Sequence, residues 1–259
     1  MNISNKILDE LERKIDCLKQ KDKDRTEYKK IRDEVFNQAT LLTIYKLFTD
    51  KVIDRIEFPI STGKEANVFR ARTNLGGMLA IKIYRVDNAT FRNISTYITG
   101  DPRFMHIAGK RKYLIEAWAS KEYKNLLRLE DAGVRVPKAV AQLENVLVME
   151  YIGDETEPAP LLKDYNLKNA SQLYDTILNY MKKMYLNAEL VHSDLSEYNI
   201  LMNKGKPVII DVAQAVTLRH PMAWEFLERD ATNISRFFTK EGVKTSKEEI
   251  LNYIGAKRT

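Results

Sequence analysis

The sequence has little that would cross-link the chain or anchor it in a membrane. Cys17 is the only cysteine, so an internal disulfide is excluded, which fits a reducing cytoplasm. No run approaches the roughly 18 consecutive apolar residues of a membrane span, and the polar, charged N-terminus does not resemble a secretory signal. We therefore expect a cytoplasmic protein without a membrane partner.

The charge balance is modestly basic. The 42 Lys and Arg residues exceed the 36 Asp and Glu residues, which gives a formal net charge of +6 and an isoelectric point near 9.1. This excess favours polyanionic partners such as nucleotides or RNA, although surface solubility explains it about as well.

Hydrophobic periodicity predicts an α+β chain with a sheet-rich front half and a helical back half. Helical patterns begin after Ser4 and after Thr26. Strand-like runs follow at 52–60, 67–71, 78–84 and 146–151. Further helices are predicted at 112–131, from Ser171 as the cap to about residue 187, and at 222–238.

The segment LVHSDLSEYNILMNKGKPVIIDVAQ, residues 190–214, carries the strongest chemical signal. Asp194 is followed by Asn199 and then, after two short apolar strands and a turn, by Asp211. This spacing is typical of the catalytic loop and metal-binding strand of protein kinases. There the first Asp orients or accepts the hydroxyl proton, and the Asn and second Asp hold divalent ions. Each residue alone is also a common turn residue, but the joint pattern favours the catalytic interpretation.

A candidate phosphate loop lies at Ser61-Thr62-Gly63-Lys64-Glu65-Ala66-Asn67-Val68. Ser61, Gly63, Ala66 and Val68 keep the frame of a kinase glycine-rich loop, with small residues in place of two glycines. Small residues let backbone N–H groups approach phosphate oxygens. The alternative is a plain hairpin turn.

Lys82 ends the run Leu79-Ala80-Ile81-Lys82, which is similar to the V-A-I-K strand of kinases. There the Lys contacts the nucleotide phosphates and pairs with a helix Glu. Among the downstream glutamates Glu116, Glu122 and Glu130, we favour Glu122 as the partner. The alternative is a strand Lys that points to solvent.

The remaining positions of the site follow the order of kinases. Met149, Glu150 and Ile152 would form a hinge whose backbone binds adenine. His192 is expected to pack beneath the metal-binding strand rather than act in acid–base chemistry. Arg229-Asp230 would either brace the catalytic loop or form a surface salt bridge.

The chain also departs from ordinary protein kinases. Ser193 replaces the Arg that normally holds a phosphorylated activation loop, and Asp211 is followed by Val-Ala rather than Phe-Gly. No Ala-Pro-Glu motif follows. The residues after Asp211 are too few for an activation segment and the usual helices, so we expect the peptide-substrate platform to be missing.

Five motifs together resemble the RIO family of atypical kinases: STGKEANVF, AIKIYR, KRKYLIEAWASKEYKNL, LVHSDLSEYNIL and IIDVAQAV. The likeness covers about residues 50–240, and the loop and insert resemble the type-one branch. The short tail is similar to archaeal members.

The resemblance implies a trimmed two-lobe protein-kinase-like fold with extra N-terminal helices. Residues 1–50 would be these helices, 51–149 the N-lobe with a mobile insert at about 86–110, and 150–259 a reduced helical C-lobe. Basic residues flank or lie in the insert: Arg85, Arg92, Arg103, Lys110, Arg111 and Lys112. They are expected to contact RNA, unless they serve solubility alone.

The resemblance also implies ATP-dependent Ser/Thr autophosphorylation or ATP hydrolysis with Mg²⁺ or Mn²⁺, a phosphoaspartate at Asp211, and a role in small ribosomal subunit maturation. By carry-over, Asp194 is catalytic together with Lys82 and Asp211, and Asn199 and Asp211 bind metal. The residues expected to bind the nucleotide are Ser61, Gly63, Lys64, Glu65, Val68, Lys82, Glu122, Met149, Glu150, Ile152 and Glu197.

Two other functions are compatible with parts of the pattern. Small-molecule kinases of the aminoglycoside or choline type share the Asp, Asn and Asp order, but they usually have a larger helical lobe. An ATP-bound module that binds RNA or the pre-ribosome would not need turnover, and the intact catalytic residues argue against it.

Overall fold

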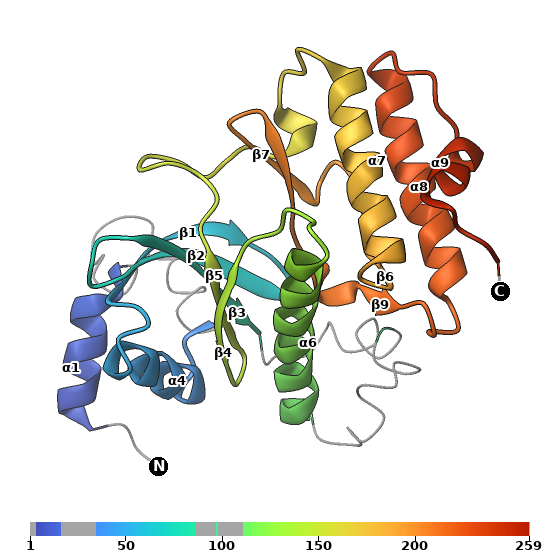
Figure 1. Cartoon of the computed structure of the whole chain (residues 1–259). Helices are drawn as coiled ribbons and strands as arrows, with labels where there is room; N and C mark the ends of the chain where they lie inside the picture. The colour runs from blue at the N-terminus through green and yellow to red at the C-terminus, as the bar shows by residue number, and fades with distance from the viewer. Residues whose placement is uncertain (1–3, 17–34, 86–96, 98–110, 259) are drawn as a thin grey trace. The chain divides into compact units, whose positions relative to one another are not determined.

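The computed structural model describes residues 4–16, 35–85, 97 and 111–258 (Figure 1). The chain divides into two compact units, one of residues 1–92, 107–123 and 139–151, the other of residues 93–106, 124–138 and 152–259. Apart from Tyr97, the insert predicted at 86–110 lies outside the described residues, and so do Cys17 and Thr26. The predicted boundaries after residues 50 and 149 remain predictions.

An antiparallel sheet forms the centre of the first unit, with the strand order β1-β2-β3-β5-β4. Its strands are β1 (Arg55–Thr62), β2 (Ala66–Arg72), β3 (Met78–Tyr84), β4 (Ala139–Leu143) and β5 (Val146–Glu150). β3 has its predicted bounds, whereas β1 begins later than predicted and continues through Ser61 and Thr62. β4 was not predicted.

Two N-terminal helices, α1 (Asn5–Lys14) and α4 (Gln38–Thr49), share one apolar core with this sheet. Buried members include Leu11, Ile15, Ile44, Leu47, Phe48, Phe69, Ile81, Ile83 and Val148. Each such side chain contributes roughly 1.5–3 kcal/mol when it leaves water. α4 begins at Gln38, where Asn37 caps it by accepting the Thr40 N–H at 3.0 Å, and the helix start predicted after Thr26 lies outside the described residues.

The helix α6 (Arg111–Asp131) carries residues of both units, and the division falls between Tyr123 and Lys124. It ends as predicted near Gly133, which has a φ of +76°. The Val134 N–H donates to the Leu129 carbonyl at 2.9 Å and closes the last turn.

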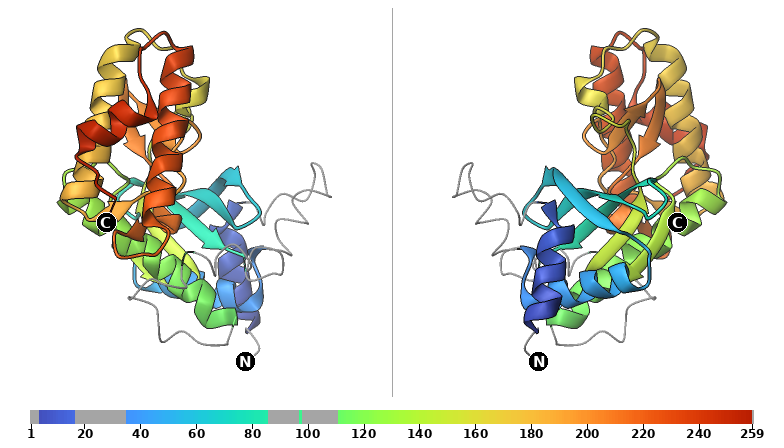
Figure 2. Two further views of the ribbon diagram at one scale, coloured as in Figure 1. Left: turned by 90° about the vertical axis from the view of Figure 1, so that its right-hand side faces the viewer. Right: turned by 90° about the vertical axis from the view of Figure 1, so that its left-hand side faces the viewer.

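The second unit is mainly helical, with α7 (Ala170–Leu186), α8 (Ala223–Lys240) and α9 (Lys247–Ile254). α9 packs against both longer helices (Figure 2). Short strands and 3₁₀ turns complete the unit: β6 (Leu190–Val191), β7 (Ile200–Asn203), β8 (Lys206–Ile209), β9 (Val216–Thr217), η2 (Leu162–Asp164) and η3 (Val212–Gln214). β7 pairs with β8, and β6 pairs with β9.

Local chemistry explains where these elements begin and end. Lys204 and Gly205 both have positive φ, as a tight hairpin turn requires, and they join β7 to β8 where a turn was predicted. The predicted cap of α7 was wrong: Asn169, not Ser171, caps the helix by accepting the Gln172 N–H at 3.1 Å. No helix among the described residues is long and apolar enough to cross a membrane.

Candidate active site

The predicted phosphate loop is a hairpin connection between β1 and β2. Ser61 pairs with Val68 across the two strands, so the loop proper is Gly63-Lys64-Glu65. The Gly63 N–H donates to the Ala66 carbonyl at 3.0 Å, and a Cβ at Gly63 would lie 3.0 Å from that same oxygen. Gly63 therefore allows a close turn that a larger residue would strain. The hairpin geometry is the same in the phosphate-loop and plain-turn interpretations.

Lys82 and Glu122 form a buried ion pair. The Lys82 Nζ lies 2.9 Å from Glu122 Oε1 and 2.8 Å from Oε2. Glu122 is 1% exposed and Lys82 is 8% exposed, so the alternative of a solvent-facing Lys is wrong. The Tyr84 hydroxyl also donates to Glu122 Oε2. Removal of one partner would leave a buried charge uncompensated, at a cost of about 3–5 kcal/mol.

The predicted hinge residues lie at the end of β5 and just after it. Met149 and Glu150 are half-buried at its end, and pair with Ala80 and Leu79 of β3. Ile152 belongs to the second unit and is buried. Its carbonyl accepts the Ala159 N–H at 3.0 Å, so this oxygen is already used within the chain.

Helix α8 holds the predicted catalytic loop by its backbone. Asp230 is 1% exposed, and its two oxygens accept the N–H groups of Ser193 and Leu195, each at 2.8 Å. Arg229 donates to the Ser193 carbonyl, and Asn233 donates to the Leu195 carbonyl at 3.2 Å. Arg229-Asp230 therefore braces the loop rather than forming a surface salt bridge.

This brace holds an unusual backbone. Ser193 is fully buried with a φ of +71°, a conformation that non-glycine residues rarely adopt. Burial raises the pKa of Asp230 to about 8, against the lowering effect of the two backbone N–H donors. The loop conformation thus depends on contacts from outside the loop.

His192 packs beneath the strand that leads to Asp211, as predicted. Its Nε2 lies 3.0 Å from the Ile210 carbonyl, which can only accept, so Nε2 carries the proton. Its Nδ1 is buried and has no hydrogen-bond partner among the described residues. Burial lowers the pKa of His192, and the ring is held neutral beneath the strand that leads to Asp211.

Asp194 and Asn199 lie together at the end of this loop. The Asn199 Nδ2 donates to the Asp194 carbonyl at 2.7 Å and to Asp194 Oδ2 at 3.2 Å. The pKa of Asp194 is raised because burial disfavours its charge, while the Asn199 hydrogen bond opposes this shift. A half-buried carboxylate with a raised pKa suits a group that orients or accepts a proton.

Asp211 immediately precedes the 3₁₀ turn η3 and is exposed, with left-handed φ and ψ of 58° and 54°. The next residues are held by α6, because the Asn125 Nδ2 donates to the carbonyls of Val212 at 2.8 Å and Ala215 at 3.1 Å. Asn125 is fully buried. Sequence analysis missed this residue, which lies three positions after Glu122 on the same helix.

The donor chemistry of Asn199 and Asp211 fits Mg²⁺ or Mn²⁺. Amide and carboxylate oxygens are the ligands that these hard ions prefer. The Asn199 amide nitrogen is turned to Asp194, so among the described residues its oxygen is left for a ligand. Within the described part of the chain, no three His, Cys, Asp or Glu side chains are grouped to hold a metal. In kinases the other ligands are phosphate oxygens.

Glu197 lies in the same loop between Asp194 and Asn199. Its carbonyl accepts the Lys163 N–H at 3.2 Å. Its Oε2 is buried and has no hydrogen-bond partner within the part of the chain that the structure describes. A carboxylate oxygen in this position suits a bound hydroxyl or cation.

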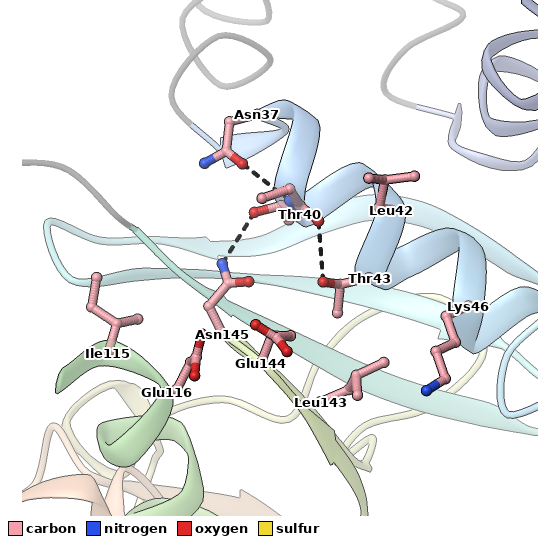
Figure 3. A pocket seen from close by; sticks show the side chains of 11 residues that line it. Asn37, Thr40, Leu42, Thr43, Lys46, Ile115, Glu116, Leu143, Glu144 and Asn145 are labelled. Atoms are coloured by element: carbon pink, nitrogen blue, oxygen red, sulfur yellow. Dashed lines mark hydrogen bonds between the residues drawn. The ribbon is translucent and has the colours of Figure 1, made fainter. Parts of the chain in front are cut away.

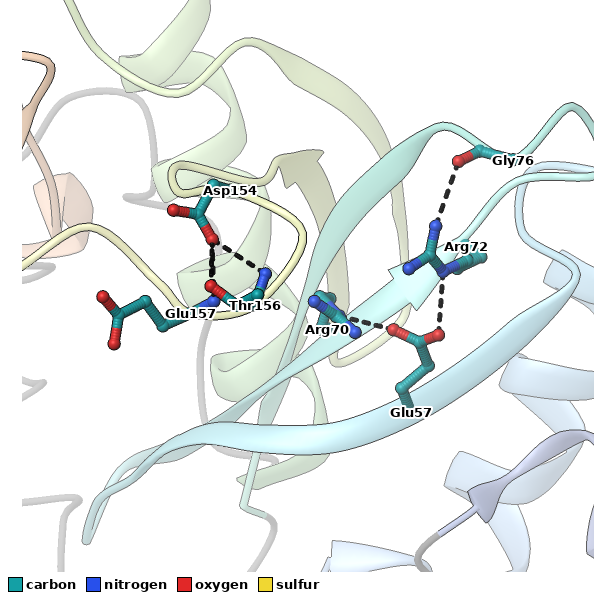
Figure 4. A network of polar contacts seen from close by, with 7 residues as sticks. All are labelled: Glu57, Arg70, Arg72, Gly76, Asp154, Thr156 and Glu157. Atoms are coloured by element: carbon teal, nitrogen blue, oxygen red, sulfur yellow. Dashed lines mark hydrogen bonds and ion pairs between the residues drawn. The ribbon is translucent and has the colours of Figure 1, made fainter.

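Two further polar networks are shown in Figure 4. In the first unit, Glu57 of β1 binds Arg70 at 2.5 Å and Arg72 at 2.8 Å, and so ties β1 to β2. In the second unit, Asp154 Oδ1 accepts the Thr156 hydroxyl and N–H and the Glu157 N–H. These donors lower the Asp154 pKa to about 2, the Thr156 hydroxyl most strongly.

Comparison with known proteins gives one consistent result. The RIO domain family matches residues 67–251. The RIO-type serine/threonine-protein kinase Rio1 of Haloferax volcanii is 40% identical over 251 residues, which cover 97% of this chain and 86% of that protein. Its counterpart from Thermoplasma acidophilum is 45% identical over 190 residues, which cover 73% of this chain and 100% of that protein.

A solved structure confirms the predicted fold. The Rio2 kinase of Chaetomium thermophilum, solved as an ADP/Mg²⁺-phosphoaspartate complex, superposes with a TM-score of 0.65. The match covers 84% of this chain and 66% of that chain, at 23% identity. The chain has a protein-kinase-like fold, and by its sequence it belongs to the RIO family of kinases.

Proposed function

We propose that this chain is an atypical serine/threonine kinase that transfers the γ-phosphate of ATP to a protein hydroxyl or to water. The protein hydroxyl can belong to the chain itself, which is autophosphorylation. The observation that carries the proposal is the buried Lys82–Glu122 ion pair. A buried ion pair adds little net stability compared with apolar residues. Its presence inside a sheet is therefore best explained by chemistry, because a Glu-held Lys is the phosphate-binding group of kinases.

Nucleotide contacts are proposed for both ends of the cofactor. Ser61, Gly63, Lys64, Glu65 and Val68 would surround the phosphates, where the small Gly63 turn admits close backbone approach. Met149, Glu150 and Ile152 would meet adenine through backbone groups. Lys82, held by Glu122, would contact the α- and β-phosphates.

Catalysis is assigned to the loop that α8 braces. Asp194 would orient the attacking hydroxyl or water and receive its proton, and its carboxylate is positioned by Asn199. Asn199 and Asp211 would hold Mg²⁺ or Mn²⁺, which neutralises charge on the phosphates, and Glu197 in the same loop would contact the nucleotide. Asp211 is also the proposed phospho-acceptor, since the related Rio2 kinase was solved with a phosphoaspartate.

The proposed setting is maturation of the small ribosomal subunit in the cytoplasm. Family membership and the net charge of +6 support a partner rich in phosphate, such as precursor ribosomal RNA. The basic residues of the insert are candidates for this contact.

The test is ATP turnover by the purified chain with and without small-subunit precursors, measured as ADP release and as phosphate on protein. We expect Mg²⁺-dependent turnover that precursors change and that Asp194→Asn abolishes. Phosphate on an added aminoglycoside or choline would instead identify a small-molecule kinase. ATP binding without turnover in either condition would identify a binding module.

A further inference from the structure

A hydrogen-bonded chain links the N-terminal helix α4 to the Lys82–Glu122 pair. It begins at Thr40, which is fully buried in the first turn of α4. The Asn145 side-chain amide donates to the Thr40 hydroxyl at 3.1 Å and to the Tyr84 carbonyl at 2.8 Å. The Tyr84 hydroxyl then donates to Glu122, the partner of Lys82.

Asn145 fixes the end of β3 in two ways. The Tyr84 N–H donates to the Asn145 backbone carbonyl at 2.9 Å, and the Asn145 side chain returns a bond to the Tyr84 carbonyl. Tyr84 is 3% exposed, and Lys82 Nζ lies 5.2 Å from the centroid of its ring. Its aromatic ring is therefore enclosed, and its hydroxyl has a fixed direction toward Glu122.

The hydrogen-bonded series begins at α4, beside a pocket of about 460 Å³ (Figure 3). Thr40, Thr43 and Asn145 line it together with Ile115 of α6 and Leu143 of β4. The Asn145 hydrogen bond to the buried Thr40 joins the first turn of α4 to the β4–β5 turn beside this pocket. The apolar core holds the later turns of α4, at Ile44 and Phe48.

We propose that Tyr84 is a positioning residue for the phosphate-binding pair, and that α4 acts on the pair through Thr40 and Asn145. The inference rests on the proposed function and assigns a catalytic purpose to the N-terminal helix. Tyr84 restrains the Glu122 carboxylate, and Asn145 sets where the Tyr84 backbone lies. Loss of either contact lets the Lys82 ammonium move away from the phosphates.

The test compares the KM for ATP and kcat of five variants with those of the wild type. Tyr84→Phe removes one hydroxyl that donates to a charged group, so kcat/KM for ATP should fall about tenfold, with a higher KM. Thr40→Val, one step further away, should raise KM about threefold, and Thr40→Ser should restore it. Thr43→Val is the matched control, because among the described residues the Thr43 hydroxyl donates only within α4, to the Ala39 carbonyl at 3.1 Å.

The KM separates positioning from simple instability, because a destabilised protein has fewer active molecules but an unchanged KM. Wild-type KM in Tyr84→Phe, or equal effects of Thr40→Val and Thr43→Val, would overturn the inference. Glu122→Gln serves as the reference. If Glu122→Gln loses turnover while Tyr84→Phe and Thr40→Val keep wild-type kinetics, only this inference fails. If Glu122→Gln also keeps wild-type kinetics, the proposed role of the ion pair fails as well.

Discussion

Replacement of Asp230 by Ala tests how the catalytic loop is held. The Ser193 and Leu195 N–H groups would both lose an acceptor that lies 2.8 Å away. A buried donor without a partner costs about 1–3 kcal/mol, so the two together cost about 2–6 kcal/mol. Removal of a carboxyl whose pKa burial has raised offsets part of this cost. We expect a net loss of about 2–4 kcal/mol.

Urea unfolding of the wild type and of Asp230→Ala measures this loss of stability. Turnover is then compared under conditions in which both proteins are folded, which isolates the effect on the loop. Because Ser193 is held in a left-handed conformation, release of its N–H should lower turnover at least about tenfold. Thr232→Ala is the matched control on α8, since within the described part of the chain its exposed side-chain hydroxyl bonds only to the Glu228 carbonyl. The reasoning is refuted if Asp230→Ala matches this control in both stability and turnover.

Three further predictions concern neighbouring residues. Asp211→Ala should nearly abolish metal-dependent turnover because it removes a carboxylate ligand, and wild-type turnover would contradict the metal assignment. Asn125→Ala should cost about 2–4 kcal/mol of folding stability, because it leaves two carbonyls unpaired and creates a cavity. It should also lower turnover more than it lowers ATP affinity. Equal losses of turnover and of ATP affinity would mark a purely structural contact. Burial lowers the His192 pKa, so the neutral ring contributes its full share of the free energy of unfolding above about pH 6.5, and this share falls as the pH drops below that value. Thermal unfolding of wild type and His192→Gln should differ in this acid slope, and identical slopes would count against a buried neutral ring.

The parts of the site that could be predicted from the sequence are those marked by a pattern among neighbouring residues. β3 is an apolar run that starts after Gly76-Gly77, so its bounds and the place of Lys82 followed directly. The spacing from Asp194 to Asn199 fits within one loop, and the structure brings these two side chains together. The roles of these residues in nucleotide binding remain predictions.

Contacts between distant segments had no such signal. Asn125 meets the carbonyls of Val212 and Ala215, far along the chain, and nothing in its neighbours indicates this. Glu116 and Glu122 lie six residues apart, about 240° around a helix, so only one can face Lys82. Which one does so depends on how α6 is rotated by packing, and the structure selects Glu122.

Helix ends were predicted less well because several residues could cap them. Asn169 and Ser171 are both good capping residues, and the non-helical backbone of Asn169 decides between them. α9 was missed although Ser246 and Glu249 form a complete capping box, because its short apolar pattern is weak. The two-residue strands β6 and β9 are too short for any periodicity.

The most direct test of the account is the separation of ATP binding from ATP turnover in Asp194→Asn. Asp194 is assigned to the attacking hydroxyl or water, not to the phosphates of the bound nucleotide. We therefore predict unchanged ATP affinity, measured by calorimetry with Mg²⁺, and turnover reduced at least about 100-fold, or about 3 kcal/mol of barrier. Wild-type turnover in this variant, or a loss of affinity equal to the loss of rate, would contradict the assignment of this loop as the catalytic centre.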